Sequence, residues 1–118
     1  MIGIHIRRSD NLVSIRYSPL SFFLEKIDFE ISINPAVKFY LSTDDSNIGN
    51  TLCKKYPNNI LFNNKILDRN SELGIIDAYL DMLYLATTVK IYGSYFSSFS
   101  EIASKLGNVE LEILKINE

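Results

Sequence analysis

Short apolar runs alternate along the chain with longer stretches in which apolar residues recur at helical spacing. The apolar runs are typical of strands buried in a sheet, and they predict strands over 2–6, 37–42, 60–62, 89–92 and 109–114. The helically spaced stretches predict helices over 19–31, 47–56, 72–87 and 99–106. We expect the first strand to be central and buried on both faces, because it is an apolar, β-branched run. The last should lie towards an edge, because it alternates as Val-Glu-Leu-Glu-Ile-Leu.

Local signals predict where the first helix begins and ends. The polar segment 7–18 is interpreted as a loop, with Ser18 capping a helix that carries Pro19 in its first turn. The pair Asn34-Pro35 ends that helix. Its inward stripe is expected to consist of Leu20, Phe23, Leu24 and Ile27.

The two later helices have signals of their own. Gly93 and Ser94 are interpreted as a turn, and Ser98 with Glu101 as the capping box of the helix that follows it. Gly107 then closes that helix. On the long helix over 72–87, the residues expected to face inward are Leu73, Ile76, Leu80 and Leu83.

Strands that alternate with helices predict an α/β fold: a Rossmann-like, three-layer α/β/α domain with about five parallel strands. Ligands of such sheets bind beyond the carboxyl ends of the strands. Four polar segments fall there, so we expect them to meet at one edge of the sheet. These segments are 7–10, 43–46, 63–71 and 94–98.

Composition and charge bear on the number of domains, the possible ligands and the cellular setting. With 118 residues the chain is expected to form one domain over 1–118. A net charge of −2 gives no general attraction to nucleic acid, so any anion site must be local. The lone Cys53 favours a reducing, cytoplasmic setting, and no signal peptide or transmembrane segment is visible. No metal-binding motif is present either, so we expect neither a metal nor another cofactor.

The first strand runs into candidate anion-binding side chains. Arg7 and Arg8 follow it, and a guanidinium suits phosphate oxygens, although solvated surface charges are an open alternative. His5 lies within the strand, where it is either a core histidine or a ligand-binding group. Asp10 can pair with Arg8 and hold it in place.

Two acids follow the second strand. Asp45 is expected to cap the next helix, since Asp is favoured at that position. Asp44 is the more available carboxylate, able to accept two N–H donors of a guanine edge or to orient an arginine. The sequence leaves both alternatives open.

Asp81 lies among apolar residues of the long helix, where a buried carboxylate is costly unless it is paired. With Asp77 and Tyr84 it can form a polar strip, which either faces solvent or meets an arginine or ligand. Ser97 and Ser98 precede the last helix, where they can cap it and also border an anion site at its N-terminus.

Three segments together resemble the fucosyltransferases, in particular the α1,6-type enzymes of N-glycan cores and rhizobial Nod factors and the protein O-fucosyltransferases. The segment IGIHIRRSD is similar to their HxRR-[ST]-D motif, and FYLSTDD to their second motif. The third similarity comprises DMLYLA and the turn YGSYFSSFSEIA. The ordered set covers residues 2–106 and implies the donor-binding half of a GT-B glycosyltransferase.

The resemblance implies roles for individual residues. Arg7 would hold the β-phosphate of GDP-fucose and act as the catalytic residue, while His5 and Asp81 would read the guanine and ribose side. The residues that would line or support the pocket are Arg8, Asp44, Asp45 and one of Ser97 or Ser98. Such enzymes resemble inverting, metal-independent transferases, in which an acceptor hydroxyl attacks the sugar while arginine stabilises the departing diphosphate.

The chain also departs from the family pattern. It begins immediately before the HxRR-like strand, so we expect the N-terminal acceptor domain to be absent, with a partner chain or oligomer completing the cleft. The expected partners are a GDP-sugar donor and an oligosaccharide acceptor. Two alternatives are a non-catalytic GDP-sugar-binding module or half-enzyme, and a structural domain whose arginines only pair with acids.

Overall fold

The computed structural model describes residues 1–8, 11–62 and 72–116, which form one parallel sheet with helices on both faces. The strand order is β3-β2-β1-β4-β5, and every neighbouring pair is parallel. The strands are β1 (Ile2–Ile6), β2 (Phe39–Thr43), β3 (Ile60–Phe62), β4 (Lys90–Ser94) and β5 (Glu110–Leu114). The predicted fold class, the central first strand and the edge position of the last strand are confirmed.

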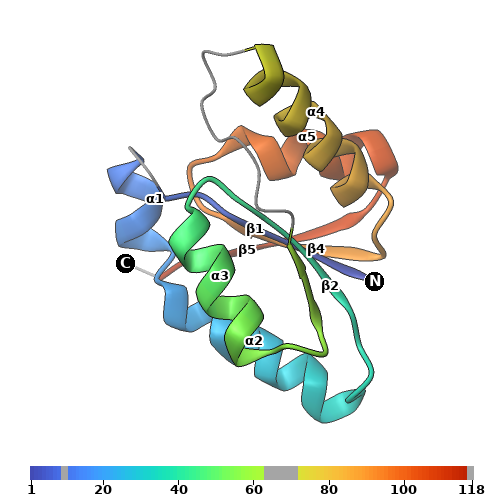
Figure 1. Ribbon diagram of the computed structural model, residues 1–118. Coiled ribbons are helices and arrows are strands. Elements are labelled where there is room, and N and C mark those ends of the chain that lie inside the picture. Colours follow the sequence, from blue (N-terminus) through green and yellow to red (C-terminus); the bar gives the residue numbers. More distant parts are fainter. Residues whose placement is uncertain (9–10, 63–71, 117–118) are drawn as a thin grey trace.

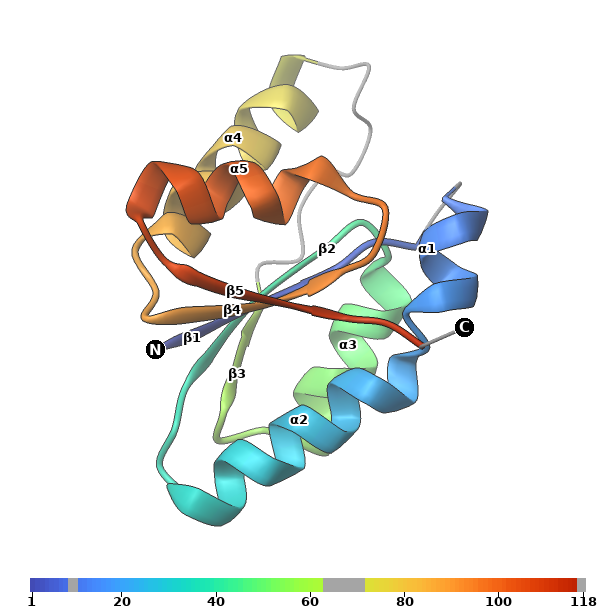
Figure 2. The same ribbon diagram turned by 180° about the vertical axis from the view of Figure 1, so that it is seen from behind.

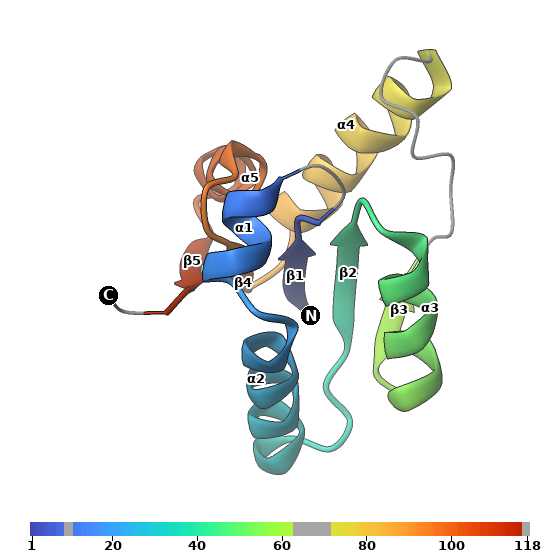
Figure 3. The same ribbon diagram turned by 90° about the vertical axis from the view of Figure 1, so that its left-hand side faces the viewer.

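The helices form the outer layers of the domain. They are α1 (Leu12–Tyr17), α2 (Leu20–Ile33), α3 (Ser46–Lys55), α4 (Glu72–Ala86) and α5 (Ser98–Gly107). Figures 1 and 2 show α2 and α3 on one face of the sheet and α4 and α5 on the other. Figure 3 looks onto the carboxyl ends of the strands, where α1 lies in front of the sheet. None of the described helices could cross a membrane.

The central strand β1 supplies both faces of the core. Ile4 and Ile6 are buried on the α2 side, in a cluster with Phe23 and Ile27 of α2. Burying side chains of this kind contributes about 1.5–3 kcal/mol each. On the opposite face, a Cβ at Gly3 would lie 2.9 Å from the Leu85 side chain, so glycine allows α4 to approach the strand closely.

Helix α1 lies within the segment that the sequence analysis interpreted as a loop. The Oδ1 atom of Asn11 accepts the Ser14 N–H at 2.9 Å and caps this helix of six residues. Leu12, Val13 and Ile15 are exposed, while Ser14 is fully buried. The apolar side chains therefore do not mark the buried side, and hydrophobic spacing could not reveal the helix.

The N-terminus of α2 also differs from the prediction. Pro19 occupies the cap position, and Ser18 does not cap the helix. Instead the buried Ser18 hydroxyl donates to the Leu114 carbonyl at 2.5 Å and accepts the Tyr95 N–H at 2.7 Å. Ser18 thus connects the start of α2 to the end of β5 and to the segment after β4.

Helix α4 turns a different side inward from the one predicted. Ile76, Leu80 and Leu83 are exposed, whereas Leu85 and Asp81 are buried. The side chain of Leu73 lies outside the described part of the structure. The helix is apolar on nearly all sides, so periodicity alone could not select the buried face.

Helix α5 begins and ends one residue away from the positions predicted from sequence. Ser97 is the cap residue, and within the described structure it makes no side-chain capping bond. The Ser98–Glu101 capping box is therefore wrong, because Ser98 is already helical. Gly107 is the last helical residue, and Asn108 takes the left-handed conformation with φ of 52°.

The predicted turn at Gly93 and Ser94 is also wrong, because these residues are the last two of β4. A Cβ at Gly93 would lie 2.6 Å from Ser100 Oγ. Glycine is therefore required here for the close packing of α5 on the strand, and not for a turn.

Candidate functional site

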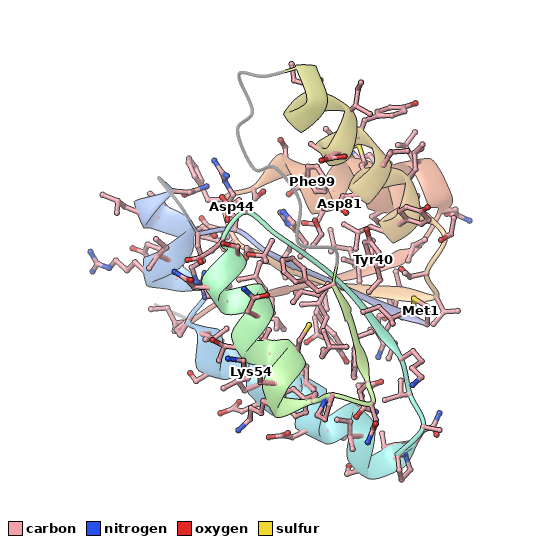
Figure 4. All side chains as sticks on the ribbon, in the orientation of Figure 1. Met1, Tyr40, Asp44, Lys54, Asp81 and Phe99 are labelled. Atoms are coloured by element: carbon pink, nitrogen blue, oxygen red, sulfur yellow. The ribbon has the colours of Figure 1, made fainter. Side chains whose placement is uncertain are left out.

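The sequence-predicted site residues that the structure describes lie at or near the carboxyl edge of the sheet. Arg7 follows β1 and Asp44 follows β2, and Ser97 lies after β4 at the start of α5. Asp81 approaches the same sheet from the middle of α4 (Figure 4). Asp10 and the polar segment 63–71, which were predicted at this edge, lie outside the described residues.

Arg7 and Asp44 form an ion pair that joins the ends of β1 and β2. Arg7 Nη1 donates to Asp44 Oδ2, and the backbone N–H of Arg8 donates to Asp44 Oδ1 at 2.7 Å. The side chain of Arg7 is 17% exposed and that of Asp44 is 6% exposed. The carboxylate is thus held on both oxygens, and the Arg7 side chain retains a small exposed fraction at the end of β1.

The backbone of Arg7 is fixed from the other neighbouring strand. The Ser94 hydroxyl at the end of β4 accepts the Arg7 N–H at 2.9 Å and donates to the His5 carbonyl at 3.3 Å. Arg7 is therefore held by β4 through its backbone and by the end of β2 through its side chain. Ser94 was not predicted as a site residue, because the sequence placed it in a turn.

Arg8 is buried and acts as a brace. Its guanidinium donates to the Arg7 carbonyl at 2.9 Å and to the Ser18 carbonyl at 2.8 Å. Burial lowers the pKa of Arg8, and the nearby negative charges of Asp44 and Asp45 oppose this shift. Arg8 therefore supports the position of Arg7 from behind and is less available to a ligand.

Asp45 caps α3, as the sequence predicted. Its Oδ1 atom accepts the Asn47 N–H at 2.9 Å and the Ile48 N–H at 3.3 Å. Asp44 and Asp45 thus have separate roles, since the first orients an arginine and the second stabilises a helix N-terminus.

Asp81 is buried, with 6% of its surface exposed. Its Oδ1 atom accepts the Tyr40 hydroxyl at 2.5 Å and its Oδ2 atom accepts the Ser42 hydroxyl at 2.9 Å. Tyr40 and Ser42 are two residues apart on β2, so they share one face of the strand. This alternate spacing was the signal in the sequence that could have identified them as partners of Asp81.

The alternative of a solvent-facing strip containing Asp81 is therefore wrong. Its neighbours on α4 differ from it, because Asp77 is only partly buried and Tyr84 is largely exposed. The Tyr84 ring lies against that of Tyr40, with centroids 5.3 Å apart.

His5 lies on the face of the sheet that α5 covers. Its ring stacks on that of Phe99, with centroids 4.7 Å apart and an interplanar angle of 24°. In the sheet register His5 is level with Ser42, a partner of Asp81. His5 is almost fully buried, as expected for a core histidine, and it lies beneath the edge where Arg7 emerges.

The N-terminus of α5 completes this edge. Ser97 is its cap residue, and Ser98 is exposed at the first helical position. A helix N-terminus presents backbone N–H groups and the positive end of its dipole. Together with Arg7, this arrangement can bind an anion and stabilise negative charge that develops on it.

Comparisons with known proteins identify the fold. The structure of NodZ alpha-1,6-fucosyltransferase co-crystallized with GDP matches 89% of this chain, with a TM-score of 0.61 and 21% sequence identity. A NodZ structure soaked with GDP-fucose matches 89%, with a TM-score of 0.56 and 24% identity. POFUT1 in its apo form matches 98%, with a TM-score of 0.64 and 12% identity. The chain has a fucosyltransferase-like fold, as the resemblance of its motifs predicted.

The chain spans about a third of the length of these NodZ structures and 41% of POFUT1. No protein-family model matches the sequence. No curated protein matches it either.

Proposed function

We propose that this chain is the donor-binding domain of a GT-B-type, fucosyltransferase-like glycosyltransferase that binds GDP-fucose and supports transfer of the sugar to a glycan hydroxyl. The observation that carries the proposal is the position of Arg7 at the carboxyl edge of the sheet, oriented by Asp44 and Ser94. The fold is shared with a fucosyltransferase that was crystallised with GDP, which makes a nucleoside diphosphate the anion to test first.

Arg7 is the residue that we assign to the diphosphate. A guanidinium has five N–H donors, so Arg7 can hold Asp44 and also donate to a phosphate oxygen. The N-terminus of α5, which follows the neighbouring strand β4, adds further backbone N–H donors at this edge. Negative charge grows on the diphosphate as the sugar departs, and a pre-oriented guanidinium stabilises that charge.

Asp81 is the residue that we assign to the guanine base, with His5 on the ribose side. An ionised carboxylate has about four lone-pair sites, and Tyr40 and Ser42 each donate to one oxygen. The carboxylate is thereby fixed in orientation beside the carboxyl edge of the sheet, where it would accept the N–H groups of a guanine edge. The reaction assigned to these residues is inverting and requires no metal.

We also propose that acceptor binding needs a second domain, supplied by a partner chain, an oligomer or a longer form of the protein. The proposal is supported by the length of the solved neighbours, since this chain spans only about a third of NodZ. The same observation favours a second candidate function, a GDP-sugar-binding module or half-enzyme without transfer activity of its own.

Two measurements test these proposals. Calorimetric titration should show GDP binding with a Kd below about 1 mM and clearly weaker binding of UDP. Equal binding of both, or of neither, contradicts the assignment of a guanine nucleotide. A transfer assay with GDP-fucose and an oligosaccharide acceptor then separates the transferase from the binding module.

A further inference from the structure

Helix α4 exposes a second apolar side in addition to the one that packs on the domain. Asp81, Met82 and Leu85 face the rest of the domain and are buried or partly buried. On the other side, at the periphery of the domain (Figures 1 and 3), exposed apolar residues recur three or four positions apart, and each is 38–59% exposed. These residues, called the α4 stripe, are Ile76, Tyr79, Leu80, Leu83 and Tyr84.

An apolar groove lies beside the C-terminal end of the α4 stripe. It has a volume of ≈ 380 Å³ and is bounded by α4 on one side and by β2 and β3 on the other. The stripe is therefore a ridge of side chains with a groove next to it, and helices pack by placing such ridges into grooves. The lining residues are Met1, Tyr40, Leu61, Tyr84 and Thr87.

The exposed apolar area is large enough for a stable dimer. The stripe is extended by Leu61 and Met1 of the groove and by Val89, whose N–H donates to the Met1 carbonyl at 3.0 Å. These residues are about half exposed, so together they offer roughly 800 Å² per copy. That area is about what each partner contributes to a stable specific interface, and it exceeds the largest apolar patch of a typical monomer.

The charge of α4 favours a second copy of this chain over a membrane surface. Residues 72–86 include no lysine or arginine, whereas helices that lie in a membrane interface carry basic residues on their polar side. The α4 stripe itself contains no charged residue. Two stripes can therefore come together without burying a charge, as the core of a protein interface requires.

The α4 stripe is also separate from the candidate donor site. Asp81 projects from the opposite side of α4, toward β2. The groove lies toward the amino ends of the strands, because Met1 precedes β1 and Thr87 precedes β4. Arg7 lies at the other end of β1, so a domain that faces the carboxyl edge would leave the groove uncovered.

We propose that the chain forms a symmetric dimer in which the α4 stripes of two copies pack against each other. Side chains of each stripe enter the groove of the other copy, and the same surface is used on both, as in most two-fold symmetric dimers. The carboxyl edges of both sheets stay open in this arrangement. The inference goes beyond donor binding and needs no ligand, so its failure would leave the proposed function standing.

Sedimentation equilibrium of the wild type and of variants at Leu80, in the middle of the α4 stripe, tests the inference. At about 50 μM we expect the wild type to have twice the 13.5 kDa mass of one chain, because interfaces of this size bind with micromolar or lower Kd. Leu80→Glu places a charge within the interface and should raise the dimer Kd at least about tenfold. Leu80→Gln removes apolar area without adding charge and should act in the same direction, which keeps the test decisive if the Glu variant does not fold.

Phe29→Glu is the matched control, because Phe29 is a 54% exposed apolar residue on α2, on the opposite face of the sheet. It should remain dimeric, and circular dichroism should show that the variants are folded. A wild type that stays monomeric up to about 500 μM overturns the inference, and its binding to neutral phosphatidylcholine vesicles would then identify a membrane as the occupant. A folded Leu80 variant that dimerises like the wild type also overturns it.

Discussion

The hydroxyl of Tyr40 on β2 donates to Asp81 on α4 at 2.5 Å, across 41 positions of sequence. This bond fixes a carboxylate beside the sheet, and it makes Tyr40 a positioning residue as well as a core residue. Tyr40→Phe keeps the packing but removes one donor from a buried charge. We expect a loss of about 1–3 kcal/mol in the free energy of unfolding, measured by urea denaturation.

Tyr84→Phe is the control for that change, because it removes the same group from a largely exposed ring that contacts Tyr40. It should alter stability by less than about 0.5 kcal/mol. Equal effects of the two substitutions would show that the bond to Asp81 has no special importance.

Asp44→Ala should weaken GDP binding by at least about tenfold, because Arg7 then loses the carboxylate that orients it. The neighbouring Asp45→Ala removes the cap of α3, at a cost of about 1 kcal/mol in stability, and should change GDP affinity much less. Calorimetry and urea denaturation of both variants separate the two roles. Loss of GDP binding in Asp45→Ala alone would reverse our assignment of the two acids.

The alkaline limb of the stability curve depends on Tyr56. Burial, together with its hydrogen bond to Asp28, raises the pKa of Tyr56 well above its ordinary value of 10.0. Above about pH 10 the unfolded chain releases this proton while the folded chain retains it. Stability is therefore present below pH 10 and is lost as the pH rises, by at most about 1.4 kcal/mol per pH unit for this group.

Tyr56→Phe should flatten that part of the curve, as measured by urea denaturation between pH 9 and pH 11. The variant has no proton to lose at this position, so its stability should fall less steeply than that of the wild type. Parallel curves for the two proteins would show that Tyr56 does not contribute to the alkaline loss.

The order of strands and helices could be predicted from sequence because short, mainly apolar runs alternate with longer stretches of helical spacing. Helix α1 could not be predicted from sequence, because its apolar residues face solvent and its cap residue Asn11 lies in a polar stretch. The prediction of the inward face of α4 was wrong for a related reason. Apolar residues lie on nearly all sides of this helix, so its orientation follows from the hydrogen bonds of Asp81 to Tyr40 and Ser42 on β2.

The candidate site was predictable in part. Arg7, Asp44 and Asp81 are charged residues at strand ends or within an apolar helix, so their positions identify them. The hydroxyl groups that fix them were missed, because Ser94 was interpreted as part of a turn and Tyr40 as an ordinary residue of a strand, while their partners Arg7 and Asp81 lie far away in the sequence.

The central claim is that Arg7 binds the diphosphate of a guanine nucleotide, and titration of GDP into three forms of the chain tests it most directly. We expect the wild type to bind GDP, Arg7→Ala to lose detectable binding, and Arg8→Lys to be only weakened, because Arg8 acts as a brace behind Arg7. Arg16→Ala, on the exposed side of α1, controls for net charge and should bind as the wild type does. Equal, mild losses in Arg7→Ala and Arg8→Lys would contradict the claim.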